Sequence, residues 1–271
     1  MSKVTAVITT YKNPNFVKAL HSVLTQTYKD LEIIIVDGAN DSHIRTLTKR
    51  RENITYIGIE NDTGPQNART LGCKAAKGKY IAMLDDDDKW TPTKIEEQIK
   101  EVKNQKAAMV GCYAIVKGYG CYGIQIANLE PTYEDLLKGF AISLTSSILI
   151  EKKVLEEVGW WRNLTIGPEY DLALRVAKAG YKIRVVPKPL IIYNKDMSVK
   201  NYSGKTQTSV RITEILTFWN QYANDFIPYI GIKGLLYNVA RTFVILVILF
   251  YGYVVKKNMT NALDNLKEKI L

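Results

Sequence analysis

Four consecutive aspartates, Asp85 to Asp88, directly follow the apolar run Tyr80 to Leu84. Carboxylates this close together repel one another unless a cation lies among them. A short apolar run predicts a buried strand, so the acids stand at its C-terminal end, where open α/β sheets bind ligands. Carboxylate oxygens suit hard ions such as Mg²⁺ or Mn²⁺, which usually hold phosphates as well. The run predicts a metal–phosphate site, with a solvated acidic loop as the alternative.

Two further carboxylates stand where a ligand can reach them. Asp37 ends an aliphatic run and precedes Gly38, so it either accepts hydrogen bonds from a base or ribose or caps a helix. Glu169 follows Pro168, which is typical of a first helical position. The helix dipole stabilises an ionised carboxylate there, as a general base requires. An ordinary glutamate at a helix start is the alternative.

Arg69 is the candidate cationic residue for a site that binds phosphates. It can neutralise a diphosphate or contact a base, or it can be an ordinary surface arginine. The chain has two histidines, His21 and His43, both in polar stretches, which argues against a histidine metal site or triad. Three cysteines form neither an even framework nor a metal-ligand spacing, and this predicts reduced structural thiols.

Alternating strand and helix patterns in the first hundred residues predict a parallel sheet covered by helices. The strands are expected at Val4 to Thr10, Leu31 to Val36, Ile54 to Ile59 and Tyr80 to Leu84. The helices are expected from Phe16 to Leu24, from Asn67 to Lys77, and from Pro92 onwards.

The second half of the chain is less regular. Its patterns predict strands over 107–117, 119–127, 142–150 and 181–186, and helices over 152–158 and 168–179. We therefore expect one catalytic domain over residues 1–200, with a nucleotide-binding half over 1–105 and an acceptor half over 106–200. Residues 201–271 are expected to form a C-terminal helical segment.

The C-terminal segment carries a long apolar stretch. Thr242 to Val255 contains no charge, and Leu235 to Val255 is long enough to span a bilayer but includes Arg241. No acidic residue occurs between Pro228 and Ala262. A basic rim around an apolar helix favours an anionic membrane surface. We expect association with the cytoplasmic face, by one span or an interfacial helix; a buried helix or a dimer contact is the alternative.

The bulk composition agrees with several partners. The chain has 271 residues and a formal net charge of +10, which fits nucleic acid, anionic membranes or phosphate-bearing substrates. The apolar stretch near the N-terminus is short and broken by threonines, so no signal peptide is expected. These properties favour a cytosolic setting.

A series of short motifs occurs in a fixed order along the chain. They are Val7 to Tyr11, Ser22 to Tyr28, Leu31 to Gly38, Gly64 to Gly72, Ala76 to Asp88, Thr145 to Ile150, Val154 to Gly159 and Glu169 to Arg175. Over roughly residues 3–195 this set resembles family 2 glycosyltransferases, inverting enzymes of the GT-A fold. The resemblance implies an α/β, Rossmann-like fold with a mostly parallel central sheet and flanking helices.

The resemblance also implies a role for each candidate residue. Thr10, Tyr11, Asp37 and Arg69 would line the nucleotide pocket. Asp85, Asp86 and Asp87 would form an Asp-x-Asp motif that binds the nucleotide sugar, with Mn²⁺ or Mg²⁺ held by Asp87 and Asp85. Glu169 would be the base that deprotonates the acceptor hydroxyl.

Two departures from the family pattern affect these roles. Many relatives have a second aspartate, often in contact with uracil, where this chain has Gly38. The base position is usually an aspartate preceded by a glutamate, whereas here Pro168 precedes Glu169. Asp171 is therefore a rival for the base, although its spacing favours a structural role.

The sequence thus predicts an inverting transferase that moves a sugar from a nucleoside diphosphate, UDP favoured, to a hydroxyl of a glycan or polyprenyl-linked acceptor. A metal-dependent phosphatase is less well matched, because its motif belongs on the first strand. A basic, non-enzymatic nucleic-acid binder is the alternative from another class, but the lysines are spread along the chain. We therefore expect no nucleic-acid partner.

Overall fold

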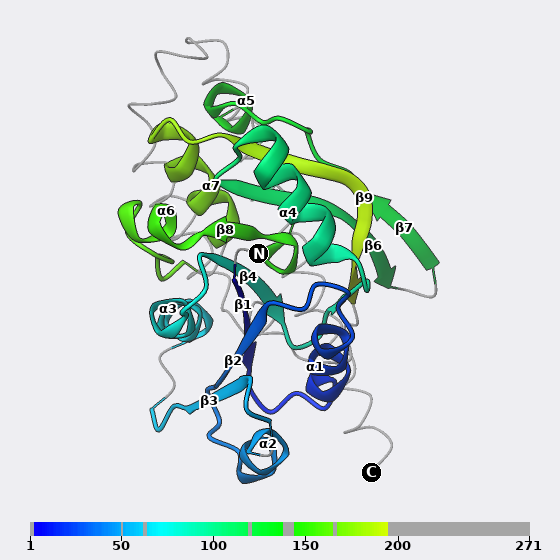
Figure 1. Ribbon diagram of the computed structural model, residues 1–271, viewed down its shortest axis with the longest axis vertical. Helices are drawn as coiled ribbons and strands as arrows, with labels where there is room; N and C mark the ends of the chain where they lie inside the picture. The colour runs from blue at the N-terminus through cyan, green and yellow to red at the C-terminus, as the bar shows by residue number, and fades with distance from the viewer. Residues whose placement is uncertain are drawn as a thin grey trace, which may run out of the picture. The chain divides into compact units, whose positions relative to one another are not determined.

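The sheet of this computed structural model brings distant segments of the chain side by side (Figure 1). The structure describes residues 3–49, 51–61, 64–118, 121–137, 144–164 and 167–194. In these ranges nine strands form one sheet in the order β3-β2-β1-β4-β8-β6-β9-β5, with β7 paired to β6. The predicted C-terminal segment lies outside the described residues.

The first four strands are parallel neighbours. They are β1 (Val4–Thr10), β2 (Leu31–Asp37), β3 (Ile54–Gly58) and β4 (Tyr80–Asp85). Every residue of β1 is buried, as expected for a strand covered on both faces. The register pairs Thr10 with Asp37 and Thr9 with Asp85. The predicted parallel arrangement is confirmed here, and it brings the carboxyl ends of these strands to one edge.

Helices cover both faces of these strands, and Figure 1 shows α1 (Phe16–Leu24) and α3 (Pro65–Ala75) on opposite sides. The core on the α1 face also includes residues of α4 (Lys94–Gln105). On the α3 face, Gly72 lies so close to the sheet that a Cβ there would come within 2.5 Å of Val7 Cγ1. A glycine is therefore required at this position for α3 to pack against β1.

The second half mixes strand directions. Its strands are β5 (Lys89–Trp90), β6 (Met109–Gly118), β7 (Cys121–Gln125), β8 (Leu149–Glu151) and β9 (Ile183–Asn194). β8 runs antiparallel to β4 and β6, whereas β9 runs parallel to β6. The sheet is therefore mixed, and its parallel part is the half that carries the acidic run.

Several predicted boundaries were wrong. The helix expected from Pro92 begins at Lys94, and the Pro92 carbonyl instead accepts a hydrogen bond from the backbone N–H of Thr27 at 2.8 Å. The strand expected over 181–186 continues to Asn194 through two prolines, beside a register shift of β6. Prolines are tolerated at such irregularities. The helix α2 (Ser42–Thr48), capped by Asp41, was not predicted.

The strand expected over 142–150 was also wrong in its described part. A 3₁₀ turn, η1 (Thr145–Ser147), precedes the short strand β8. The Ser147 hydroxyl donates to the Leu144 carbonyl at 2.7 Å, while the Ser146 hydroxyl donates to the Asp88 side chain. Serine hydroxyls compete with ladder hydrogen bonds in this way, and the backbone turns instead of extending.

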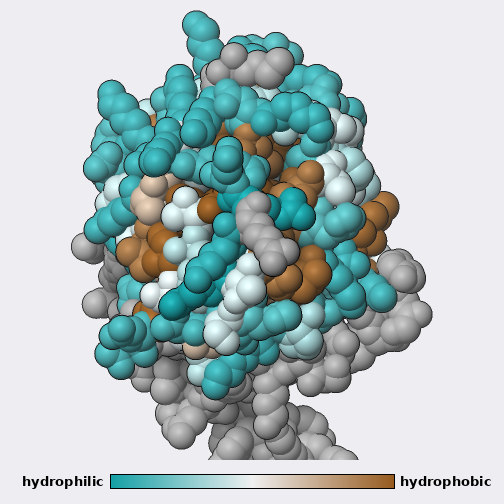
Figure 2. Space-filling model, turned by 60° about the horizontal axis from the view of Figure 1, so that its bottom comes forward, coloured by the Kyte–Doolittle hydropathy of each residue, from teal (hydrophilic) through white to brown (hydrophobic). Residues whose placement is uncertain are grey.

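The remaining helices are short or lie near the second half of the sheet. They are α5 (Tyr133–Leu137), α6 (Lys152–Glu157) and α7 (Pro168–Lys178). Within the described ranges, no helix has the length and apolar character needed to span a bilayer. On the face of the molecule in Figure 2, hydrophilic side chains predominate and apolar ones form separate patches between them.

A buried lysine lies inside the core beside α4. Lys94 is fully buried, and its Nζ lies 4.1 Å from the centroid of the Trp90 ring. None of the described residues accepts a hydrogen bond from this Nζ. Burial lowers the pKa of Lys94 to about 7 from the ordinary 10.5. The unfolded chain therefore binds this proton more tightly than the folded chain does.

We predict that Lys94→Met stabilises the protein near neutral pH. As pH falls from about 10 to 7, the unfolded chain protonates Lys94 before the folded chain does. This lowers the free energy of unfolding by about 1.4 kcal/mol per unit of pKa difference. Contact of the ammonium with the Trp90 ring partly offsets the loss. Urea unfolding should show the variant at least about 2 kcal/mol more stable at pH 7, with a smaller difference at pH 10. Lys103→Met, exposed on the same helix, is the control. An equal change at both pH values would contradict the explanation.

Candidate active site

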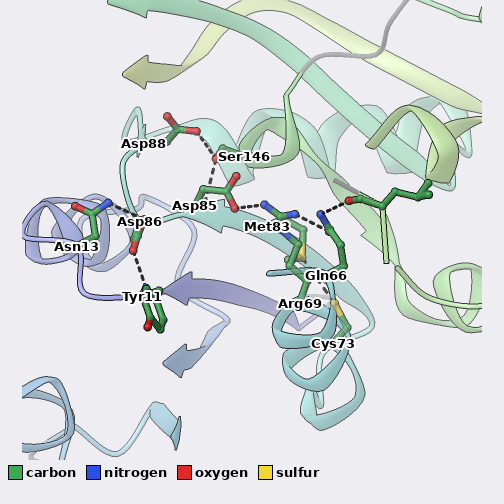
Figure 3. A network of polar contacts seen from close by, with 11 residues as sticks. Tyr11, Asn13, Gln66, Arg69, Cys73, Met83, Asp85, Asp86, Asp88 and Ser146 are labelled. Carbon is green, nitrogen blue, oxygen red and sulfur yellow. Dashed lines mark hydrogen bonds and ion pairs between the residues drawn. The ribbon is translucent and has the colours of Figure 1, made fainter. Parts of the chain in front are cut away.

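The four aspartates extend from the end of β4 into the loop before β5, and their side chains point in different directions. Asp85 points towards Arg69 on α3, whereas Asp86 points to the opposite side, towards Asn13 and Tyr11 (Figure 3). Asp85 and Asp86 are thereby turned away from each other, and each has its own partners. This arrangement reduces the repulsion that the sequence alone implies.

Arg69 forms the ion pair closest to the centre of the site. Its Nη2 lies 2.6 Å from Asp85 Oδ1, and its Nη1 donates to Gln66 Oε1 at 2.7 Å. The guanidinium also lies 5.4 Å from the centroid of the Trp161 ring. Burial lowers the pKa of Arg69, but the Asp85 carboxylate outweighs burial and the net shift is upward. Arg69 is therefore a buried, fixed cation and not the surface arginine of the alternative.

Asp86 joins the acidic run to the loop after β1. It accepts hydrogen bonds from the Asn13 amide at 2.8 Å and from the backbone N–H of Tyr11 at 3.2 Å. Burial raises the pKa of Asp86, while these hydrogen bonds oppose the rise. Tyr11, by contrast, leaves 48% of its surface exposed. The acid fixes the backbone beside an accessible aromatic ring.

Asp88 connects the run to the second half of the chain. It is 2% exposed and accepts hydrogen bonds from the Ser146 hydroxyl at 2.5 Å and the backbone N–H of Asn194 at 3.1 Å. The Ser146 Oγ also accepts from the backbone N–H of Asp85 at 3.1 Å. Ser146 was not predicted as a site residue, since a serine within an apolar stretch carries no local signal of this contact.

Asp87 is the aspartate whose carboxylate receives no hydrogen bond from another described residue. Burial, together with the nearby charges of Asp85 and Asp86, raises its pKa to about 7. A carboxylate in this situation gains stability from any cation that approaches it. The structure thus leaves one acid of the run available to a ligand.

Glu169 and Asp171 occupy different environments in the first turn of α7. Asp171 is fully buried and pairs with Arg175 at 2.7 Å and Arg162 at 3.1 Å. Glu169 is half-buried, and burial raises its pKa while the nearby Arg69 cation opposes the rise. Asp171 is therefore part of a structural ion-pair cluster, whereas Glu169 faces the charges of the acidic site.

Asp37 shapes the loop that follows β2. Its Oδ1 accepts the backbone N–H of Ala39 at 2.9 Å, and its Oδ2 accepts the backbone N–H of Asp41 at 2.7 Å. The Tyr56 hydroxyl also donates to Oδ2 at 3.0 Å, and burial together with this bond raises the pKa of Tyr56 to about 12. Asp37 is fully buried, so both of its oxygens hold the loop in place.

A pocket of about 470 Å³ opens beside this loop. It is lined by Tyr11, Lys12, Gly38, Ala39, Asn40, Ile59 and Glu60. Of the residues expected to line a nucleotide pocket, Tyr11 is in this lining. Thr10 and Asp37 are buried and are not in it, and Arg69 lies at the acidic run. Through Tyr11 and its bond to Asp86, the pocket adjoins the acids.

The carboxylates of the acidic run are the residues that could hold a divalent cation. Among the described residues, no three histidine, cysteine, aspartate or glutamate side chains converge as a metal site. Mg²⁺ is commonly bound by one or two carboxylates together with substrate phosphates. Asp87, with Asp85 next to it, supplies oxygen donors of this kind, and a cation there would offset the burial and the neighbouring charges that raise the pKa of Asp87. The chemistry of these residues fits such an ion.

Comparison with protein families identifies two matching profiles. The profile described as "Glycosyl transferase family 2" matches residues 5–151. The profile described as "Glycosyl transferase family group 2" matches residues 80–255. The first covers more than half of the chain and includes β1 to β4, the acidic run and η1.

Curated relatives and solved structures agree with these matches. The chain is 30% identical, over 68% of its length and 74% of the relative, to the Escherichia coli UDP-Glc:alpha-D-GlcNAc-diphosphoundecaprenol beta-1,3-glucosyltransferase WfaP. It is 44% identical to an uncharacterized glycosyltransferase of Rickettsia felis, over 36% of this chain and 17% of the relative's length. The crystal structure of S. aureus TarS 1-349 in complex with UDP-GlcNAc aligns with a TM-score of 0.65 and 15% identity, covering 80% of this chain and 67% of that one.

Proposed function

The chain belongs to glycosyltransferase family 2, and we propose that it transfers a sugar from a UDP-sugar to a hydroxyl of a polyprenyl-linked glycan. The observation that supports this most strongly is the acidic run beside Arg69 and Glu169, at the carboxyl edge of parallel strands. WfaP is named for UDP-glucose and a diphosphoundecaprenol acceptor. The family matches favour this function over the phosphatase and nucleic-acid-binding alternatives.

The donor diphosphate would lie between Arg69 and the acidic run. Arg69 is held by Asp85 and Gln66, so its charge needs little rearrangement to meet a phosphate oxygen, and electrostatic stabilisation of this preorganised kind is effective. When bound, Mn²⁺ or Mg²⁺ held by Asp87 and Asp85 would neutralise charge on the departing diphosphate. The nucleobase of the donor would stack on the Tyr11 ring.

The acceptor hydroxyl would be deprotonated by Glu169. The proton of the acceptor hydroxyl would pass to the Glu169 carboxylate as the hydroxyl oxygen attacks the anomeric carbon of the donor sugar. The bond between that carbon and the diphosphate oxygen would break in the same step. One such displacement inverts the anomeric configuration and requires no protein nucleophile. Asp171 is less suited to this role because it is fully buried and two arginines already pair with it.

Replacement of the Asp87 carboxylate by an amide should stop sugar transfer. We predict that Asp87→Asn lowers Mn²⁺-dependent transfer from UDP-glucose at least about 100-fold, because an amide keeps the shape but does not balance the cation. Release of UDP and formation of glycosylated lipid would be measured in parallel. Asp30→Asn, which precedes β2 at the far end of the sheet, is the matched control. Full Mn²⁺-dependent activity of the Asp87 variant would refute the metal assignment.

Replacement of the base should separate binding from chemistry. We predict that Glu169→Gln binds UDP-sugar within about threefold of the wild type but transfers at least about 100-fold more slowly, because the amide cannot accept the proton. Calorimetry and initial rates would measure the two quantities. Asp171→Asn should instead lower the free energy of unfolding by about 3 kcal/mol, because Arg175 would be left buried without its partner. An active Glu169 variant would place the base elsewhere.

We also propose that the C-terminal segment associates the chain with the cytoplasmic face of a membrane. The support is its sequence: the uncharged stretch 242–255 with basic residues on both sides, which suits anionic lipid. The full chain should sediment with vesicles that contain phosphatidylglycerol, and less so with phosphatidylcholine alone. A chain ending at residue 225 should stay in the supernatant. Equal recovery of both chains in the supernatant would contradict the proposal.

A further inference from the structure

The pocket beside Tyr11 contains two charged side chains that the proposed mechanism does not use. Glu60, which follows β3, and Lys12, which follows β1, both contribute to its lining. No hydrogen bond or ion pair within the described part of the chain engages the Glu60 carboxylate. The Lys12 ammonium lies 5.5 Å from the centroid of the Tyr11 ring. An acceptor and a donor therefore stand beside an exposed aromatic surface.

The backbone around this pocket is held in an uncommon conformation. Lys12 has φ of 52° and Asn40 has φ of 51°, in the left-handed region that non-glycine residues seldom adopt. Both residues line the pocket. Strain of this kind clusters at ligand-binding sites, where the surrounding structure must maintain it. At Asn40 the hydrogen bonds from the backbone N–H groups of Ala39 and Asp41 to Asp37 provide that support.

The residues next to Asp37 leave the pocket without another acid. Gly38 has no side chain, and Asp37 directs both oxygens to the loop and to Tyr56. Asn40 accepts a hydrogen bond from the Arg45 guanidinium through its Oδ1. Among the lining residues, Glu60 is thus the carboxylate that remains available to a ligand.

The edges of nucleobases differ in the feature that a carboxylate detects. Uracil presents a ring N–H between two carbonyl oxygens, and guanine presents a ring N–H next to one. Cytosine and adenine present a bare ring nitrogen, which a carboxylate repels. Acidic side chains accept hydrogen bonds from base N–H groups, and lysine donates to base carbonyls. A Glu60–Lys12 pair is therefore complementary to a ring N–H with an adjacent carbonyl.

We propose that Glu60 is the residue that selects the donor's base, accepting the ring N–H of uracil while Lys12 donates to a neighbouring carbonyl and Tyr11 stacks on the ring. This assignment rests on the proposed function, because it requires a nucleoside diphosphate whose phosphates reach the acidic run. Tyr11 connects the two places, since its ring lines the pocket and its backbone N–H bonds Asp86. Stacking on an aromatic ring adds affinity for every nucleobase alike. Selectivity among nucleobases must therefore come from Glu60 and Lys12.

The test is the binding of UDP, CDP and GDP to the full chain with Mn²⁺, measured by calorimetry. The wild type should bind UDP at least about tenfold more tightly than CDP, as expected for one matched polar contact. In Glu60→Gln this ratio should fall about tenfold, because the amide can donate to the bare nitrogen of cytosine. UDP methylated at N3 should bind the wild type as weakly as CDP does.

Controls and contrary outcomes separate this inference from the proposed function. Glu52→Gln, an exposed residue before β3, removes the same charge outside the pocket and should keep the wild-type ratio. Tighter binding of GDP than of UDP, lost in Glu60→Gln, would assign the same contact to guanine. If the wild type binds none of these nucleotides, the proposed function fails. If it binds UDP but Glu60→Gln leaves the ratio unchanged, the inference is wrong and the function stands.

Discussion

Mutual repulsion within the acidic run is the constraint on which the site depends. Four adjacent carboxylates stay in place because three of them have partners from different elements: Arg69 of α3 for Asp85, Asn13 after β1 for Asp86, and Ser146 of η1 for Asp88. Each partner fixes its own segment relative to β4. The charges proposed to bind the donor therefore also hold together the loops around them, and Asp87 remains as the acid of the run whose carboxylate has no hydrogen-bond partner among the other described residues.

Arg69 balances charge on two sides of this site. It pairs with Asp85, and its positive charge also lowers the pKa of Glu169 against the larger effect of burial, which raises it. A phosphate drawn to Arg69 would reduce that support for the ionised glutamate. The proposed general base and the proposed donor would thus be electrostatically coupled through one buried cation, and the pairing of Arg69 with Asp85 limits how far Arg69 can move.

The sequence predicted the parts of the fold that local pattern determines. Short apolar runs identified β1 to β4, of which β1, β2 and β4 are almost entirely buried, and the positions of Asp37 and Asp85 at the strand ends followed. The pattern could not predict that β9 continues past Pro187 and Pro189, because proline normally ends a strand. It could not place Ser146 at the site either, since that serine and Asp88 are 58 residues apart in the chain and their bond depends on the mixed sheet.

Ser146 shows why the two halves of the fold act together. Its hydroxyl donates to Asp88 and accepts from the backbone of Asp85, while its carbonyl accepts from the Trp90 indole at 2.9 Å. A residue of the second half thus holds the acidic run of the first half at both ends. The 3₁₀ turn η1 presents this serine so that its hydroxyl bridges the Asp88 side chain and the Asp85 backbone. The irregular segment that sequence patterns predict poorly is therefore the one that fixes the geometry of the acids.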